Sequence, residues 1–395
     1  MKPNLKSSKH QLHPHSIKYL NLGHPWIIKD TFTEKFNPEA DFIISSEFVL
    51  LNDPEHNRIK ARLWQKTNQS EQEVAKNFEA ELVKRIVVAL KKRQGLPFHN
   101  ERENFFWIFS EADFLPGLQL LSLNKNLIIS FYAYYWKKYE DIIVKVIQNE
   151  LPNHTSLWIQ YRSENQSKQT PPKFISGKQE PIFLIEEFGL KYNIEIGNAY
   201  DFGIYTDMAS IRKQMGRELF AQKSVLNLFS YTGAFTLQAM KYGAKHVASV
   251  DSSSVILSVL EKNLATNFSD ISTHQSVCKK AEAVLRDYAK NKTIFDTIIC
   301  DPPSAFYDGK KRKSVKDFYQ EKLMELFDIT AKNGNLIVFC NTHTFSEDNF
   351  VQLIKKILGS KPFKIKTSYR LGEDCLPLKN FPEGNYLKGI CIQKN

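Results

Sequence analysis

The chain of 395 residues has few cysteines, and no two of them have the spacing of a metal-binding pair. The five cysteines are an odd number, and none of them belongs to a C-x-x-C motif. This pattern argues against a disulfide framework and against a zinc site, so we expect no metal. The cysteines are Cys278, Cys300, Cys340, Cys375 and Cys391.

Long hydrophobic runs are also missing. No apolar stretch approaches the length that crosses a membrane. The opening residues, MKPNLKSSKHQLHPH, contain no apolar signal core. We therefore expect a cytoplasmic protein that has no membrane partner.

Acidic residues are fewer than basic ones. The chain contains 54 Lys and Arg against 43 Asp and Glu, which gives a formal net charge of +11. An excess of positive charge favours a polyanionic partner, with nucleic acid first. A basic surface without such a role is the other interpretation. The length predicts more than one domain.

The first two regions of the chain differ in the pattern of their apolar residues. Residues 1–72 alternate short apolar runs with turn residues such as NDPEHN (52–57), which predicts a small β-rich domain. The stretch 70–95 has apolar residues at every fourth position and predicts a helix that stops at Gly95.

The region 73–186 mixes this helix with strand-like runs, so we expect a central α+β domain. It should contain another helix at 137–149, and the polar stretch 164–181 should be a loop at the tip of a hairpin. The aromatic and basic cluster SFYAYYWKKY (130–139) could stack nucleobases. Packing in the core of this domain is favoured, because aromatic residues dominate cores.

Strand and helix patterns alternate across residues 187–395. Apolar runs that do not alternate with polar residues, separated by helical stretches, indicate a parallel sheet covered on both faces. The predicted fold class of this region is α/β with a doubly wound sheet. The runs are SVLNLF (224–229), HVASV (246–250), TIIC (297–300) and NLIVFC (335–340).

Ligands of doubly wound sheets lie beyond the carboxyl ends of the strands. Gly233 follows the first run, and Asp251 directly follows the second run. Asp251 lies 18 residues after Gly233. An acid about twenty residues beyond a glycine turn is typical of ribose binding. The turn lacks the G-x-G-x-x-G pattern, so a nucleoside without pyrophosphate, such as S-adenosylmethionine, fits better. A tight turn followed by a helix-capping aspartate is the alternative.

Two further strand ends carry polar residues. Asp301-Pro302-Pro303 follows the buried run TIIC, and neither proline can donate a backbone N–H. This corner is rigid and rich in acceptors, which suits a ligand that brings donors. Asn341 follows the run at 335–340.

Five segments in order resemble the class I methyltransferases of large-subunit (23S) ribosomal RNA that carry an N-terminal PUA domain. The resemblance covers nearly the whole chain and implies a Rossmann-like catalytic domain at 187–395, after a PUA-like domain at 1–72 and a central domain at 73–186. It also implies S-adenosyl-L-methionine as cofactor and RNA as substrate. The segments are GHPWII (23–28), SEADFLPGLQLLSL (110–123), the supposed hairpin FGIYTDMASIR (202–212), VLNLFSYTGAFTLQAMKYGAKHVASVDSS with FDTIICDPPSAF, and the C-terminal strand FPEGNYLKGI (381–390).

By this resemblance, two groups of residues should form the site. The cofactor should be bound by Asp207, Tyr231, Thr232, Gly233, Asp251 and Asp301. Asp301, Pro302 and Asn341 should border the methyl group and the target base. Two positions depart from the family pattern. Lys280 stands where an acid is usual, with Glu282 as a weak substitute, and Met208-Ala209 stand where Gln-Arg follow the hairpin aspartate.

Asn341 also bears on which atom is methylated. Family members that make 5-methylcytosine have a cysteine here, since C5 of cytosine needs a thiolate to add at C6. Cys340 comes one residue earlier and should face away, because successive strand residues point to opposite sides. The stretch Phe339-Cys340-Asn341-Thr342 resembles the branch that methylates guanine N7, which we rank ahead of cytosine C5, with exocyclic amines third.

The sequence thus predicts an RNA methyltransferase acting on ribosomal RNA. The basic segment DGKKRKSVK (308–316) beside the proposed pocket could grip phosphates. A catalytically inactive RNA-binding or assembly factor with the same fold is the competing class, and a Rossmann dehydrogenase is a distant third. The sequence leaves open whether the protein forms a homodimer.

Overall fold

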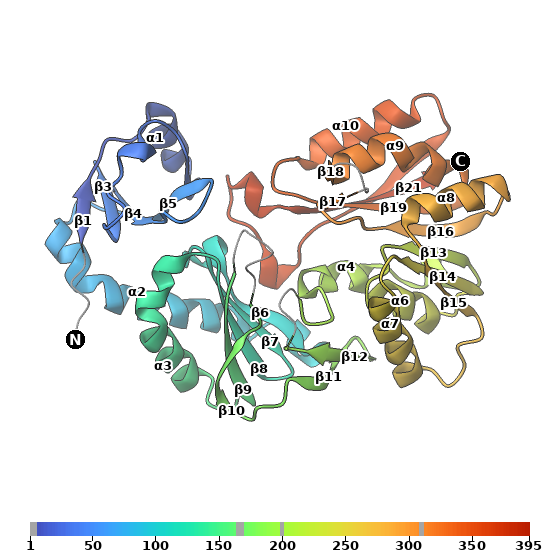
Figure 1. Ribbon diagram of the computed structural model, residues 1–395, viewed down its shortest axis with the longest axis horizontal. Helices are drawn as coiled ribbons and strands as arrows, with labels where there is room; N and C mark the ends of the chain where they lie inside the picture. Colours follow the sequence, from blue (N-terminus) through green and yellow to red (C-terminus); the bar gives the residue numbers. More distant parts are fainter. Residues whose placement is uncertain (1–5, 163–169, 198–200, 308–311) are drawn as a thin grey trace. The chain divides into compact units, whose positions relative to one another are not determined.

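The structure of the protein, a computed structural model, comprises two compact units (Figure 1). It describes residues 6–162, 170–197, 201–307 and 312–395. Unit 1 consists of Met1–Ile185, Glu195–Phe202 and Asp374–Gly384, and unit 2 of Glu186–Ile194, Gly203–Glu373 and Asn385–Asn395.

This division differs from a contiguous domain at 187–395, because two later segments pack with unit 1. Polar contacts account for one of them: Asp374 forms a buried ion pair with Arg102 at 2.7 Å, and Glu383 meets His24 at 3.0 Å. The division into three domains stays a prediction.

The amino-terminal part of unit 1 is a five-stranded sheet in the order β1-β3-β4-β5-β2. Ile43, Leu50 and Ala61 are fully buried in its small core, against Leu20 of the helix α1. The region is therefore β-rich, as its alternating pattern predicts. The elements are β1 (Ser7–Lys9), α1 (Pro14–Asn21), β2 (Trp26–Ile28), β3 (Phe42–Ser45), β4 (Phe48–Asn52) and β5 (Ile59–Lys66).

The long helix α2 (Glu71–Gln94) follows this sheet. A capping box starts it, in which the side chain of Ser70 accepts from the backbone of Glu73 and Glu73 accepts from the backbone of Ser70. Gly95 caps its carboxyl end, as predicted. The apolar positions at every fourth residue are buried and anchor the helix to the second sheet: Phe78, Leu82, Ile86 and Leu90.

The second sheet of unit 1 has the strand order β10-β9-β8-β7-β6, and α2 and the helix α3 pack on it. Its elements are β6 (Asn104–Phe109), β7 (Leu118–Leu123), β8 (Asn126–Phe131), α3 (Glu140–Glu150), β9 (Ser156–Tyr161) and β10 (Lys173–Gly177).

Two predictions for this region were wrong in detail. The helix expected at 137–149 begins as a 3₁₀ turn at Tyr134–Tyr139 and becomes α-helical only at α3. The hairpin expected around 164–181 is present, since β9 and β10 pair antiparallel, but β10 occupies part of the stretch expected to be loop. Phe174 and Trp158 face each other across this pair, with ring centroids 5.1 Å apart. Residues 163–169 of that loop lie outside the described residues.

The aromatic cluster at 130–139 is mainly part of the core. Phe131, Trp136 and Tyr139 are buried against α2 and β9. Tyr132 and Tyr134 are each 41% exposed. Packing therefore outweighs base stacking for this segment, as expected.

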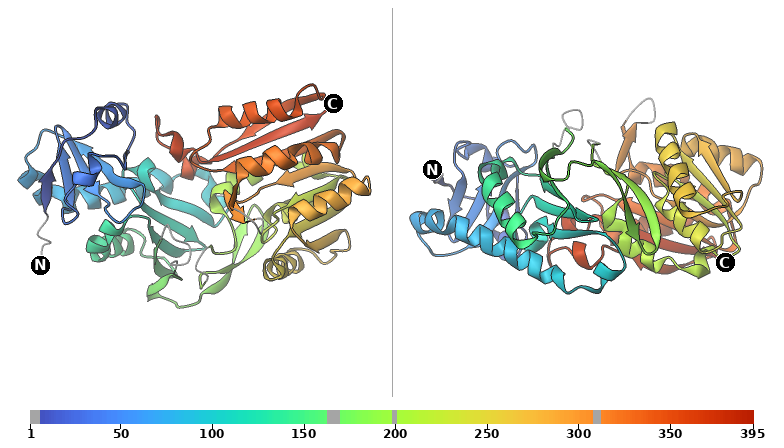
Figure 2. Two further views of the ribbon diagram at one scale, coloured as in Figure 1. Left: turned by 45° about the horizontal axis from the view of Figure 1, so that its top comes forward. Right: turned by 90° about the horizontal axis from the view of Figure 1, so that it is seen from below.

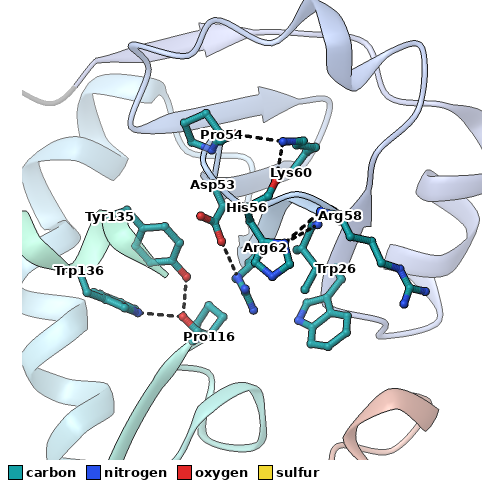
Figure 3. Close-up of polar contacts among 12 residues, drawn as sticks. Trp26, Asp53, Pro54, His56, Arg58, Lys60, Arg62, Pro116, Tyr135 and Trp136 are labelled. Atoms are coloured by element: carbon teal, nitrogen blue, oxygen red, sulfur yellow. Dashed lines mark hydrogen bonds and ion pairs between the residues drawn. The ribbon is translucent and has the colours of Figure 1, made fainter. Parts of the chain in front are cut away.

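A buried ion cluster joins the first sheet to the second within unit 1 (Figure 3). Arg62 lies 3.1 Å from Asp53 and 2.8 Å from Glu111. Burial alone lowers the pKa of Arg62, but the carboxylates of Glu111 and Asp53 outweigh it and raise this pKa. Nearby, the side chains of Tyr135 and Trp136 both donate to the carbonyl oxygen of Pro116.

Unit 2 is built on a seven-stranded sheet in the order β15-β14-β13-β16-β19-β21-β20. The first five strands of this order are parallel. β21 runs antiparallel between β19 and β20, so β20 points in the same direction as the first five strands. The strands are β13 (Ser224–Leu228), β14 (His246–Asp251), β15 (His274–Cys278), β16 (Phe295–Cys300), β19 (Thr330–Asn341), β20 (Phe363–Tyr369) and β21 (Leu387–Lys394).

Helices cover both faces of this sheet, as Figures 1 and 2 show. Three of them pack on one face and bury Leu226, Ile298 and Val338. The others pack on the opposite face. The first set is α8 (Ala281–Lys290), α9 (Val315–Asp328) and α10 (Glu347–Leu358), and the second is α5 (Arg217–Phe220), α6 (Ala234–Lys241) and α7 (Ser254–Asn267). The α/β doubly wound prediction is confirmed.

The segment 202–212 is not a hairpin. It forms a 3₁₀ turn at Thr206–Met208 and the short helix α4 (Ala209–Gln214), while the two-stranded sheet of β11 (Ile182–Glu187) and β12 (Leu190–Glu195) precedes it. Buried Arg212 explains the turn, because its guanidinium pairs with Glu187 and also donates to the carbonyl oxygen of Tyr205 at 3.0 Å. Across the described residues, no helix has the length and apolarity needed to cross a membrane.

Candidate active site

A cavity of about 630 Å³ opens at the carboxyl ends of β13, β14, β16 and β19 in unit 2. This is where a doubly wound sheet holds its ligand. Six of the predicted site residues line it: Asp207, Tyr231, Asp251, Asp301, Pro302 and Asn341. Three separate loops therefore converge on one pocket.

The turn between β13 and α6 has an unusual backbone. Phe229, Tyr231 and Gly233 all have positive φ angles, of 58°, 50° and 90°. Such angles cost an ordinary residue about 1–2 kcal/mol, and glycine almost nothing. Phe229 and Tyr231 therefore adopt backbone angles that glycine usually provides. This is why the turn contains only one glycine. Tyr231 presents its ring to the pocket beside Tyr205, with centroids 5.0 Å apart.

Thr232 and Gly233 do not line the cavity. The hydroxyl of Thr232 donates to the carbonyl oxygen of Gly203 at 2.6 Å, and Asn263 donates to the Thr232 carbonyl at 2.9 Å. A Cβ at Gly233 would lie 2.6 Å from Cγ of Leu260, so only glycine allows α6 and α7 to approach here. Both residues shape the turn, and their contact with a cofactor stays a prediction.

Asp251 ends β14 and accepts two backbone hydrogen bonds. The N–H of Tyr231 lies 3.2 Å from one carboxylate oxygen, and the N–H of Ser253 lies 3.0 Å from the other. Partial burial raises the pKa of Asp251, although backbone N–H groups of Ser253 and Ser252 oppose the shift. The carboxylate is thereby held at the rim of the pocket, where it can accept from ribose hydroxyls.

Asp301 and Asp207 place two carboxyl groups in the same pocket. Burial, together with the negative charge of Asp207, raises the pKa of Asp301 to about 7, and Arg212 opposes this shift. Tyr386 donates to Asp207 at 2.6 Å. Two carboxylates in one partly desolvated site favour a cationic ligand, because a positive charge between them restores their ionised form.

Asn341 lines the pocket, whereas Cys340 lies in the hydrophobic core beneath α9 and α10. Burial raises the pKa of the Cys340 thiol to about 11. Cys300 is likewise fully buried, and all five cysteines are free and absent from the pocket lining. The strand-parity argument for both cysteines is confirmed. The Tyr319 hydroxyl lies 3.0 Å from the Cys300 carbonyl oxygen and 2.6 Å from that of Phe339, which fixes the two strand ends side by side.

Lys280 and Glu282 line the pocket at the start of α8. Lys279, Arg286, Lys313 and Lys322 add further positive charge to its wall. Lys313 belongs to the predicted phosphate-gripping segment and pairs with Glu321 at 2.5 Å, while residues 308–311 of that segment lie outside the described residues. No group of three or more potential metal ligands occurs among the described residues.

Sequence reasoning missed Ser230, Tyr205 and Leu387, which also line the pocket. Ser230 is only 5% exposed, and its hydroxyl has no hydrogen-bond partner within the described part of the chain. A buried hydroxyl without a partner is costly unless a ligand supplies one. Its position between Phe229 and Tyr231, inside the SYTGAF motif, is the only sequence signal that could have suggested it.

The fold and this pocket define a class of enzyme, the Rossmann-like methyltransferases. Residues 111–363 match the family model described as S-adenosylmethionine-dependent methyltransferase, which covers more than half of the chain. The chain belongs to this family, and S-adenosyl-L-methionine is its cofactor.

Relatives agree with this assignment, and a solved structure has the same fold. The chain is 26% identical to the ribosomal RNA large subunit methyltransferase I of Alteromonas mediterranea, over 97% of this chain and 98% of the relative. It is 26% identical to the putative ribosomal RNA large subunit methyltransferase YwbD of Bacillus subtilis, over 84% of each. A putative SAM-dependent methyltransferase from Streptococcus mutans has the same fold, with a TM-score of 0.86, 21% identity, and coverage of 98% of this chain and 99% of that one.

The pocket residues fit the cofactor. Asp251 can accept from the ribose, Asp207 from the ammonium of the methionine part, and the unpartnered Ser230 hydroxyl is available to the same ligand. When bound, S-adenosylmethionine supplies a methyl group on a positively charged sulfur. The paired carboxyl groups of Asp207 and Asp301 match that charge.

Proposed function

We propose that the protein methylates a base of large-subunit ribosomal RNA. The names of the relatives support this substrate, and the net charge of +11 suits a polyanion. Family membership together with the lined pocket favours an enzyme over an inactive RNA-binding factor. Residues 1–72 would be a PUA-like domain that, with the central domain, grips the RNA.

We further propose direct transfer to a ring nitrogen, with guanine N7 first. One observation carries this choice: Asn341, and no cysteine, lines the pocket beside Asp301. Methylation of cytosine C5 needs a thiolate within reach of the base, whereas N7 of guanine attacks with its own lone pair. The buried thiol of Cys340, whose pKa is raised to about 11, is a poor candidate for that thiolate.

The residues at the two strand ends would orient the base. The Pro302 carbonyl and the Asp301 carboxylate can accept from an exocyclic amino group, and the Asn341 amide can donate to guanine O6 next to N7. Positioning and exclusion of water would then supply most of the rate, without a strong base.

Mass spectrometry of nucleosides tests the proposal. Large-subunit RNA from cells with and without the gene should differ in one modified nucleoside, and the purified protein with labelled cofactor should restore it. We expect 7-methylguanosine. Loss of 5-methylcytidine instead would overturn the direct route, and no change in any nucleoside would overturn the substrate.

Calorimetric titration with the cofactor separates an enzyme from a factor that binds RNA only. An enzyme should bind the cofactor with measurable heat and lose affinity in Asp251→Ala. The absence of heat in the wild type would favour the RNA-binding factor.

A further inference from the structure

Unit 1 contains a second cavity, of about 440 Å³, far along the chain from the residues of the methyltransferase pocket. It lies where α2 and α3 end, against the strands β6 and β7 and the turn between β7 and β8. Its volume falls within the usual range for small-ligand pockets. Its lining includes His99, Phe105, Trp107, Ser122 and Lys125.

Three aromatic rings form one wall of this cavity. His99 meets Phe105 edge to face at 4.4 Å, and Phe105 meets Trp107 in the same way at 5.0 Å. The rings of His99 and Trp107 are 5.3 Å apart and inclined by 34°. Nε2 of His99 lies 2.6 Å from the Arg93 carbonyl oxygen, which holds this ring in place. The wall is therefore fixed before any ligand arrives, and its rings offer a stacking surface for a planar group.

Two polar side chains at this wall can meet a ligand. Ser122, which is 3% exposed, and half-buried Trp107 both line the cavity. The hydroxyl of Ser122 and the indole N–H of Trp107 can bond a ligand that has hydrogen-bonding edges as well as a flat face, in place of water.

Lys125 supplies a cation at the rim. It is exposed, and within the described residues it forms no ion pair. Its backbone is held in the left-handed region, with φ of 62°, in the tight turn between β7 and β8. A single lysine beside a fixed aromatic wall matches one nucleotide, whose base can stack while its phosphate meets the ammonium.

We infer that this cavity is a second nucleobase site, which holds an unpaired nucleotide of the RNA substrate away from the methylated base. The inference rests on the proposed RNA substrate for its source, since a free nucleotide has the same chemistry. Trp107 would stack the base, with buried Phe105 packed edge to face against it; Ser122 would bond the edge of the base, and Lys125 would contact the phosphate.

The test uses the full-length protein with two probes, the four nucleoside monophosphates and a single-stranded oligoribonucleotide. Trp107→Leu removes the stacking ring, and Ser122→Val fills the polar corner. Lys125→Gln removes the cation, with Lys145→Gln on the exposed face of α3 as the matched charge control. Tryptophan fluorescence and fluorescence anisotropy report binding, thermal unfolding reports folding, and calorimetry reports cofactor affinity.

We expect oligonucleotide affinity to fall fivefold or more in the Trp107 and Ser122 variants and twofold to threefold in Lys125→Gln. Lys145→Gln should bind the oligonucleotide as tightly as the wild type, and all four variants should keep the cofactor affinity of the wild type. Full oligonucleotide affinity in folded Trp107→Leu and Ser122→Val would overturn the inference, and binding of monophosphates alone would overturn the RNA source. Failure of the proposed function looks different: the wild type would bind the oligonucleotide and methylate no RNA.

Discussion

The phenolic hydroxyl of Tyr386 donates a hydrogen bond to Asp207 Oδ2 at 2.6 Å. The contact joins the turn before α4 to the residue just ahead of β21, so it fixes one of the two carboxyl groups of the methyltransferase pocket. Hydrogen bonds to a charged group contribute about 1.5–3 kcal/mol. We therefore expect Tyr386→Phe to weaken binding of S-adenosylmethionine about tenfold in calorimetric titrations. Tyr242→Phe, a half-buried tyrosine outside the pocket lining, is the control and should bind normally. Equal affinities in the two variants would contradict a positioning role for Tyr386.

Cofactor binding should depend on pH through Asp301. Its pKa is raised to about 7 from the usual 3.8, so the carboxyl group is largely protonated below neutrality. Because the cofactor is cationic, its affinity should rise between pH 6 and pH 8 as Asp301 ionises. Stability without cofactor should move the other way: the contribution of Asp301 is full below about pH 4 and is lost as the pH rises through 7.

The variant Asp301→Asn isolates this effect. It should bind the cofactor weakly, with an affinity that changes little over this range, and its free energy of unfolding should lose the decline between pH 4 and pH 7. Titrations and urea unfolding at several pH values measure both. An unchanged pH dependence in this variant would assign the titration to another group.

The left-handed backbone of Tyr231 leads to a third prediction. Tyr231→Ala and Tyr231→Gly both lose the ring that contacts Tyr205, but only glycine relieves the strain of a φ of 50°. We expect the glycine variant to be more stable than the alanine variant by about 1 kcal/mol in urea unfolding, with equally reduced cofactor affinity. An alanine variant as stable as the glycine variant would show that the turn relaxes in solution.

The sequence was sufficient for the parts of the site that follow strand periodicity. Buried runs located β13, β14, β16 and β19, and strand parity correctly turned Cys340 inward and Asn341 toward the pocket. It was not sufficient where tertiary contacts decide. The supposed hairpin at 202–212 became a turn and a helix because Arg212 pairs with Glu187, a residue 25 positions away. The start of β10 within the polar stretch 164–181 was likewise missed, although it pairs with β9 across four residues.

The turn between β13 and α6 is a further part of the site that the sequence did not predict. The single glycine in SYTGAF argued against pyrophosphate binding but did not predict the shape of the turn, in which Phe229 and Tyr231 adopt the conformation that glycine usually provides. No local preference predicts such strain, because it is maintained by the surrounding packing. The unpartnered Ser230 inside this turn was missed for the same reason.

Replacing Cys340 tests the route of methyl transfer. Since this thiol is fully buried and faces the core beneath α9 and α10, Cys340→Ala should keep at least half of the methylation rate on RNA. Its main effect should be a loss of about 1 kcal/mol in the free energy of unfolding from the small cavity. Asn341→Ala is the matched variant on the pocket side and should lower the rate at least tenfold. Complete loss of activity in a folded Cys340→Ala protein, with an RNA adduct in the wild type, would instead support a thiolate mechanism.

The buried ion cluster of unit 1 gives a prediction about stability. Arg62 forms ion pairs with Asp53 and Glu111, whose side chains are 3% and 8% exposed. Figure 3 shows the pair of Arg62 with Asp53. Arg62→Ala leaves two buried carboxylates without their cation, and such a change costs about 3–5 kcal/mol. Lys66→Ala on the same strand is the control, because its pair with Glu47 is half exposed and should contribute less than about 1 kcal/mol. Urea unfolding of the two variants should therefore separate them clearly. Comparable losses would mean that Asp53 and Glu111 take up protons or water when Arg62 is removed.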